Sequence, residues 1–436
     1  MTAVLVLDRT ALCAVLLLPL LLLHAHGIAE VAVGVADCCF LARSALRHDW
    51  GWLHTRWLRI GGAWWIWLVI CSLPLPALGL GEGGLNSTVQ AVVTVRFLLF
   101  VAALEHAVLR DAMARRWLYG LLAAAVIYIE AQSLLQWLTG RNLYGAKIAW
   151  GTVLTGPFDK ARAAAPLTRL LLPVVVPVLA RLYARPSITA KLGGGALLLL
   201  ALAILMLISQ TVPVLQAVFG LAVAGLLLPR LRPALLAIAA GVCILIPGLI
   251  VISPPTYTHL VVRATGIIED FPTSAYGELY TRAFEIGLRN PTTGLGFEGF
   301  GTGCPEPIYF RPTFDHKVSN GGGAAICWDH PHNIYLEALD DSGVIGLVLF
   351  SALALAWLAP LARGLWHQPY PLRVGLFATI FVHLWPVQSS TAFTSMPLGG
   401  WFFLLLGWAL AESRAAVDPH DRRCVHAEPA RTSVAA

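Results

Sequence analysis

Charged side chains are scarce in this sequence. Asp, Glu, Lys and Arg make up 12% of the 436 residues, whereas about 25% is usual for a soluble domain. Hydrophobic residues make up 58% of the chain, which is more than a water-soluble core could bury. Apolar stretches of about 20 residues recur from end to end, and each is long enough to cross a hydrocarbon layer of about 30 Å. The composition therefore excludes an ordinary soluble protein and indicates a polytopic membrane protein.

Metal-ligand patterns are missing as well. None of the eight cysteines has a spacing typical of a metal site, and neither His106 nor His383 has a neighbouring His, Cys or carboxylate at metal-site spacing. We therefore expect neither a metal nor another cofactor. The formal charge of +6 arises from short Lys and Arg clusters between apolar runs, which is a topology signal. We expect membrane lipids, and not nucleic acid, among the partners.

Twelve apolar stretches are long enough to be membrane-spanning helices. Basic residues are concentrated in the loops that face the cytoplasm if the amino terminus does, as the positive-inside rule requires. The predicted fold is an all-α polytopic protein of the bacterial inner membrane, although the first stretch also has the length of a signal-peptide core. We place the stretches near residues 11–25, 27–44, 61–79, 88–109, 117–138, 166–183, 193–209, 212–229, 234–252, 334–359, 372–389 and 397–412.

The spans divide the chain into four parts. The first nine helices and a basic periplasmic loop at 139–165 occupy residues 1–252. A large periplasmic loop, which we expect to contain short helices, follows over residues 253–333. The last three helices lie within residues 334–412, and residues 413–436 form a cytoplasmic tail.

Both periplasmic loops are basic, against the positive-inside rule. Cations kept on this face of a membrane indicate an anionic ligand, although anchoring to lipid head groups would also account for them. The candidate cations are Arg282, Arg162, Arg169 and Lys147.

The large loop is too long to be a structureless connection. An amphipathic stretch from Tyr276 to Arg289 predicts a short interfacial helix that ends at Asn290-Pro291. Glycines on both sides of residues 304–320 predict a mobile lid. Cys304 and Cys327 are the only cysteines of the loop, and we predict that they form a disulfide on this oxidising side of the membrane.

The most specific local pattern is the run from Asp329 to Leu336, which leads directly into an apolar span. Proline suits the first position of a helix, so we expect His332 in the first helical turn. A helix start disfavours imidazolium and attracts anions, and a neutral histidine is what a general base requires. Alternatively, His332 and Asn333 only cap the helix, and Gly343 and Gly346 allow close helix packing.

Two motifs resemble those of the O-antigen ligase family, which shares a domain with O-antigen polymerases and bacterial O-linked oligosaccharyltransferases. His332-Asn333, followed by nine residues, Gly343, two residues and Gly346, resembles the signature H-[N/S/Q]-x9-G-x-x-G. Upstream, Arg282 to Phe300 resembles the R…NPxxGxGxxxF stretch of the family. The resemblance implies transfer of O-antigen polysaccharide from undecaprenyl pyrophosphate to a hydroxyl of the lipid A-core oligosaccharide, at the periplasmic face.

The residues suit a metal-independent, inverting glycosyl transfer. His332 would be the general base for the acceptor hydroxyl, and Asn333 would contribute to substrate binding. Arg282, Arg162, Arg169 and Lys147, in this order, would stabilise the departing pyrophosphate. No pair of carboxylates stands out for a covalent glycosyl-enzyme.

The chain departs from the family pattern at two places. Family members often carry Ser-Arg-Gly in a middle span, where this chain has Ser209-Gln210-Thr211, and many have an acidic residue in the last outside loop, where Gln388 to Ser395 has none. We expect the basic segment Lys160 to Arg169 to supply the missing cation. An O-antigen polymerase and a protein O-oligosaccharyltransferase are the alternatives within the enzyme class, and a transporter is an alternative outside it.

Overall fold

The computed structural model describes residues 2–310, 323–327, 330–388, 394–396 and 398–417. Among these residues the regular elements are helices, and β-structure is limited to two isolated bridges. The predicted fold class, an all-α polytopic membrane protein, is confirmed. Asp329, most of the predicted lid, residues 389–393 of the last outside loop and the tail beyond residue 417 lie outside the described residues.

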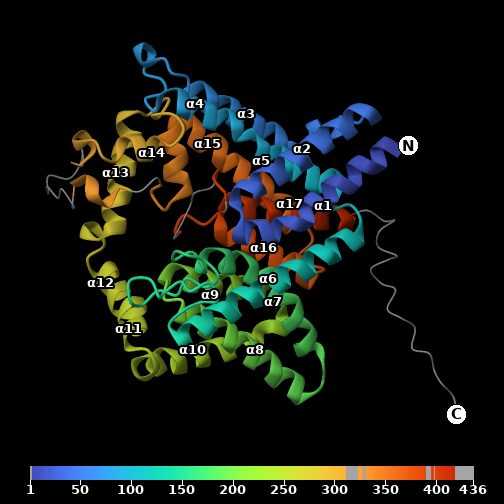
Figure 1. The fold of residues 1–436 in the computed structure, drawn as a ribbon, viewed down its shortest axis with the longest axis vertical. Coiled ribbons are helices and arrows are strands. Elements are labelled where there is room, and N and C mark those ends of the chain that lie inside the picture. The colour runs from blue at the N-terminus through green and yellow to red at the C-terminus, as the bar shows by residue number, and fades with distance from the viewer. Residues whose placement is uncertain (1, 311–322, 328–329, 389–393, 397, 418–436) are drawn as a thin grey trace.

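Long helices form the bundle in Figure 1. The helices before the basic loop are α1 (Thr2–His24), α2 (His26–Arg47), α3 (Arg56–Cys71), α4 (Gly84–Val93), α5 (Val95–Ala103) and α6 (Ala112–Thr139). Those between the two loops are α7 (Ala164–Ala184), α8 (Ile188–Leu207), α9 (Thr211–Leu227) and α10 (Arg232–Ile252). The last are α15 (Ile334–Ala362), α16 (Pro371–His383) and α17 (Leu398–Val417).

Short helices fill the connections. Those of the large loop are α11 (Pro254–Tyr257), η5 (Thr258–Val262), α12 (Arg263–Glu269), η6 (Phe271–Thr273), α13 (Ala275–Arg289), α14 (Gly299–Gly303), η7 (Pro307–Tyr309) and η8 (Gly323–Ile326). The others are η1 (Gly51–His54), η2 (Pro76–Leu78), η3 (Leu104–Val108) and η4 (Pro229–Leu231). The interfacial helix predicted from Tyr276 to Arg289 corresponds to α13.

Every predicted span overlaps one of the long helices. Seven helical segments within the described residues are long and apolar enough to cross a membrane, so twelve spans stay a prediction. Two helices end earlier than predicted, α3 at Cys71 and α16 at His383. Prolines at positions 74 and 386 follow these ends, and a residue before proline avoids the helical conformation.

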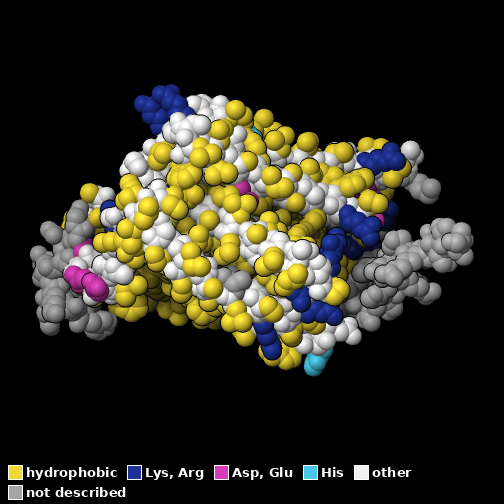
Figure 2. All heavy atoms as spheres, turned by 90° about the horizontal axis from the view of Figure 1, so that it is seen from below, with side chains coloured by type: hydrophobic (Ala, Val, Ile, Leu, Met, Phe, Trp, Pro, Cys, Tyr) yellow, Lys and Arg dark blue, Asp and Glu magenta, His cyan; other side chains and the backbone are white. Residues whose placement is uncertain are grey.

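The surface of the bundle is divided as a membrane protein requires. Figure 2 shows hydrophobic side chains over its middle and most of the visible Lys and Arg at the right-hand end of the view. In Figure 1, α13 and α14 lie at the opposite end. The predicted topology makes the basic end cytoplasmic and the end with α13 periplasmic, and we call them the inner and the outer end.

Two ion pairs join helices of the bundle. Arg96 on α5 lies 2.9 Å from Glu30 on α2, and Arg414 on α17 lies 3.1 Å from Glu105 in η3. Isolated charges are costly in a hydrocarbon layer, and each pair joins two helices that are distant in the sequence. These charges therefore have a structural role in packing the bundle.

Candidate active site

His332 lies just before α15, and the prediction that it falls in the first helical turn is wrong. The side-chain oxygen of Asn333 accepts hydrogen bonds from the backbone N–H groups of Tyr335, at 3.0 Å, and Leu336, at 3.2 Å. Asn333 is therefore the N-cap, a position at which asparagine is among the preferred residues. The helix begins after it, so Pro331 and His332 belong to the preceding loop.

The backbone of His332 is held in an uncommon conformation. Its φ is 58°, in the left-handed region that residues other than glycine rarely adopt. Its carbonyl oxygen accepts hydrogen bonds from the backbone N–H of Gln388, at 3.3 Å, and from the hydroxyl of Tyr280, at 3.4 Å. Such conformations persist where surrounding contacts fix them, so the imidazole direction is set by α13 and the loop after α16.

Two rings pack around the His332 imidazole. The centroid of Tyr276 on α13 lies 5.4 Å from it, and that of His330 lies 4.8 Å away with the rings perpendicular. Burial lowers the pKa of His330 to about 4. His330 is therefore neutral at pH 7 and adds no positive charge beside His332.

His332 and His330 line a cavity of about 510 Å³. Arg162 contributes the positive charge from the basic loop. The apolar part of the wall includes Leu22 of α1 and Trp401 of α17. The other lining residues are Trp150, Phe158, Ala161, Ala165, Pro166, Gln210, Ala275, Tyr276, Leu279, Ser395, Met396 and Leu398.

The basic loop that contributes Arg162 has a fixed conformation. The side-chain amide of Asn142 donates to the carbonyl oxygens of Gly156, at 2.7 Å, and Phe158, at 3.0 Å. The side-chain oxygen of Gln136, at the end of α6, accepts from the backbone N–H of Thr155 at 2.7 Å. Buried side chains therefore replace a regular ladder of backbone hydrogen bonds and hold this loop over the cavity.

Gln210 also lines the cavity, although the sequence indicated only that it departs from the family pattern. Its side-chain amide donates to the carbonyl oxygen of Ala161 at 3.2 Å, directly before Arg162. Family members often carry arginine at this place in the motif, and here Arg162 lines the same cavity as Gln210. The only signal in the sequence was the basic composition of the loop from Lys160 to Arg169.

The other two predicted cations of this loop lie outside the cavity wall. Arg169 is buried in α7, and its guanidinium donates to the carbonyl oxygen of Ala165 at 3.0 Å, one turn below the cavity. Lys147 is exposed and lies in a bridge with Arg141. Their predicted contacts with pyrophosphate stay predictions.

Arg282 lies inside the large loop, away from the cavity wall. Its guanidinium donates to the carbonyl oxygen of Gly323 at 2.7 Å and to Sγ of Cys327 at 3.2 Å, and it stacks on the ring of Phe310 at 4.2 Å. Its side chain is only 3% exposed, and burial lowers the pKa of this arginine. The placement favours a role in holding the loop together, and a direct contact with pyrophosphate stays a prediction.

The predicted disulfide between Cys304 and Cys327 is confirmed. The two residues are joined across the loop, 23 positions apart in the sequence. Closing a loop of this length stabilises it by about 3 kcal/mol in the chain-entropy model. The disulfide and Arg282 together tie the segments around residues 304 and 323–327 to α13.

The two sequence motifs meet at a break in α15. Ser342 and Gly343 have non-helical backbone angles there, and Gly343 has a φ of 66°. The backbone N–H of Val344 donates to the carbonyl oxygen of Pro291 at 2.8 Å, and that of Leu295 to Asp340 at 2.7 Å. The backbone groups that the break frees are thus satisfied by the Asn-Pro-x-x-Gly segment.

Gly343 is required at the break for a reason other than helix packing. A Cβ atom there would lie 2.4 Å from the backbone of Thr292, and one at Gly294 would lie 2.3 Å from the carbonyl oxygen of Asp340. The backbones therefore approach each other where only glycine fits. This corrects the alternative in which Gly343 serves close packing between helices.

No metal-ligand cluster is found in the described parts of the chain, where no three His, Cys, Asp or Glu side chains gather suitably. The metal-independent mechanism stays a prediction. The side chains that line the cavity include two imidazoles, one guanidinium, one amide and the hydroxyl groups of Tyr276 and Ser395. This set can accept a proton and bind an anion.

Comparisons with known proteins agree with the motifs. A family model described as O-antigen ligase matches residues 195–351, a range that contains both motifs and the break in α15. No curated protein matches the chain. The match supports the O-antigen ligase family for residues 195–351 of the chain.

Proposed function

We propose that this protein is an O-antigen ligase. It transfers O-antigen polysaccharide from undecaprenyl pyrophosphate to a hydroxyl of the lipid A-core oligosaccharide. The family match indicates glycosyl transfer of the ligase or polymerase type in a membrane. The observation that carries the proposal is the cavity in which His332 of the family motif and Arg162 of the basic loop line one space.

His332 is the proposed general base. The acceptor hydroxyl gives its proton to an imidazole nitrogen while its oxygen forms a bond to the anomeric carbon of the donor. The bond from that carbon to the pyrophosphate oxygen breaks, and the electron pair leaves with the pyrophosphate. Because the attack comes from the face opposite the leaving group, the anomeric configuration inverts. A positioned base typically contributes about 10²- to 10⁴-fold to the rate.

Arg162 is the proposed partner of the leaving group. A guanidinium binds phosphate oxygens through two parallel hydrogen bonds, and the charge it neutralises grows as the bond breaks. Arg162 is exposed, so it is available to a lipid-linked donor. The hydrogen bond from Gln210 to Ala161 supports this role, because it fixes the backbone next to Arg162.

The apolar wall suits the lipid part of the donor. Leu22, Met396 and Trp401 line the cavity on the side of α1 and α17, and a polyprenyl chain would remain in contact with hydrocarbon there. The polysaccharide would extend away from the membrane. The cavity thus offers separate surfaces for the chain, the pyrophosphate and the sugar.

A deletion strain tests the proposed function. We expect loss of long-chain lipopolysaccharide while polysaccharide on undecaprenyl pyrophosphate still accumulates, measured by gel electrophoresis and by mass spectrometry of extracted lipids. Complementation with the wild-type gene should restore the long chains, and the His332→Ala gene should not. Loss of the lipid-linked polymer itself would contradict ligation and indicate a polymerase.

A further inference from the structure

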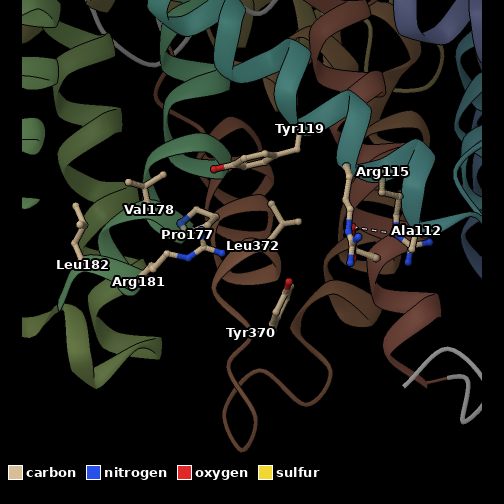
Figure 3. Close-up of a pocket in the computed structure, with 11 residues that line it drawn as sticks. Ala112, Arg115, Tyr119, Pro177, Val178, Arg181, Leu182, Tyr370 and Leu372 are labelled. Carbon is tan, nitrogen blue, oxygen red and sulfur yellow. Dashed lines mark ion pairs between the residues drawn. The ribbon is translucent and has the colours of Figure 1, made fainter. Parts of the chain in front are cut away.

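A second cavity, of about 570 Å³, opens at the inner end of the bundle (Figure 3). It lies between the start of α6, the end of α7, and the beginning of α16 and end of α17, on the opposite side of the membrane from His332. The mechanism proposed above uses none of its residues. Its polar lining residues are Arg115, Arg116, Tyr119, Arg181, Tyr370 and Glu412.

One ion pair forms a fixed part of the wall. Nε of Arg115 lies 3.1 Å from Oε1 of Glu412, and both side chains are largely buried, with 5% and 12% exposed. Arg115 also donates to the backbone carbonyl oxygens of Leu109 and Arg110, at 3.0 and 2.7 Å. The negative charge of Glu412 is therefore compensated within the wall and does not repel an anion in the cavity.

Two further arginines carry uncompensated charge. Arg116 on α6 and Arg181 on α7 are exposed and line the cavity. In the part of the chain that the structure describes, neither forms an ion pair with an acidic side chain. Figure 3 shows Arg181 pointing between the helices toward Tyr370. Two guanidinium groups around one cavity provide the planar, bidentate donors that bind phosphate oxygens.

The remaining wall is apolar. Pro177, Val178 and Leu182 of α7 and Leu372 of α16 line it. The hydroxyl of Tyr119 is already used, because it donates to the carbonyl oxygen of Val174 at 3.1 Å. A ligand that satisfies both parts of this wall has a phosphate group attached to hydrocarbon.

We propose that the inner cavity binds the head group of an anionic phospholipid. Arg116 and Arg181 bind its phosphate, and its acyl chains lie along Val178 and Leu182. Basic pockets between membrane helices on the cytoplasmic side bind acidic lipid head groups in this way. A free phosphate ion would use the same arginines and would gain nothing from the apolar wall. The bound lipid would hold α7 against α6 and α16.

Native mass spectrometry of the purified full-length protein tests the proposal. Delipidated protein is titrated with phosphatidylglycerol or with phosphatidylcholine of the same acyl chains, and the bound lipid is counted. We expect wild-type protein to prefer phosphatidylglycerol. Arg116→Gln with Arg181→Gln should weaken its retention about 30-fold, which corresponds to about 1 kcal/mol for each basic residue.

The matched control removes two other exposed arginines from the inner end. Arg47→Gln with Arg56→Gln changes the net charge equally, at residues that do not line this cavity, and it should leave retention unchanged. Thermal unfolding in detergent checks that both double variants are folded. Equal retention by wild type and the Arg116/Arg181 variant would overturn the proposal. So would an equal loss in the control, or displacement of the lipid by millimolar inorganic phosphate.

Discussion

At the scale of single residues, the contacts of His332 and Arg162 differ in kind. His332 is fixed through its backbone, by hydrogen bonds from Gln388 and Tyr280. Arg162 is exposed on a loop whose backbone is held by Gln210. A base must be positioned precisely against the acceptor oxygen. A cation that binds a flexible lipid-linked phosphate can retain side-chain conformational freedom. The two placements suit the two proposed roles.

Arg162→Gln should weaken donor binding. A hydrogen bond to a charged group contributes about 1.5 to 3 kcal/mol, so the dissociation constant for the lipid-linked donor should rise roughly 10- to 100-fold. Titration of the purified variant with donor measures this. Lys160→Gln is the control, because Lys160 is exposed, two residues away, and does not line the cavity. If both variants bind donor like the wild type, Arg162 does not contact the pyrophosphate.

His330 should make stability depend on pH. Burial lowers its pKa from 6.5 to about 4 in the folded protein. Between these values the unfolded chain binds the proton more readily than the folded protein does. The contribution of His330 to the free energy of unfolding is therefore fully present above pH 6.5 and is lost as the pH falls through this window. The loss is at most about 3 kcal/mol. Thermal unfolding at pH 7 and pH 4.5 should show a smaller change for His330→Gln than for wild type, and identical changes would contradict the assignment.

At the scale of elements, the central feature is the joint between the broken helix α15 and the segment from Pro291 to Gly296. Backbone hydrogen bonds join these two segments, which lie about 50 positions apart in the sequence, among them Val344 to Pro291 and Leu295 to Asp340. The joint fixes where α15 begins relative to α13. It therefore fixes His332 relative to Tyr276.

Gly343→Ala should disrupt this joint. The backbone angles at Gly343 are φ 66° and ψ −167°, a region that costs other residues on the order of 1–3 kcal/mol, and the added methyl group would overlap Thr292. We expect a lower unfolding temperature and lost transfer. Gly120→Ala in α6 is the control, since a Cβ there meets nothing within 4 Å. Equal unfolding temperatures for the two variants would show that the joint is not needed.

The elements also show what a sequence can and cannot predict. The long helices were predictable because each apolar run is by itself long enough to indicate a membrane-spanning helix. The disulfide was predictable because Cys304 and Cys327 are the only two cysteines in the loop. The break at Ser342 and Gly343 was not, since its hydrogen-bond partners come from a distant loop. Nor was the burial of Arg282, because an arginine in a polar loop gives no local sign that carbonyl and sulfur acceptors will surround it.

At the scale of the whole molecule, the proposed function depends on which face of the membrane each cavity meets. The cavity lined by His332 lies at the outer end of the bundle, and the inner cavity lies at its inner end. Both assignments follow from the distribution of Lys and Arg, which gather at the inner end in Figure 2. The two basic outside loops are the exception, and Arg162 in one of them lines the His332 cavity.

Reporter fusions test the orientation. A periplasm-active reporter placed after Lys147 should be active, and one placed after Gly364, in the loop between α15 and α16, should be inactive. A cytoplasm-active reporter should give the reverse pattern and serves as the control. A cytoplasmic result at Lys147 would put Arg162 on the wrong side for a periplasmic donor.

Transfer by purified His332→Ala protein is the measurement that tests the central claim most directly. With lipid-linked polysaccharide and lipid A-core supplied in detergent, the rate should fall by about 10²- to 10⁴-fold, or roughly 3 to 5 kcal/mol of barrier. Donor binding should persist. His330→Ala, in the neighbouring ring of the same cavity, should retain most of the activity. Transfer by His332→Ala at a rate close to the wild type would contradict the account, because His332 would then have no role as the base.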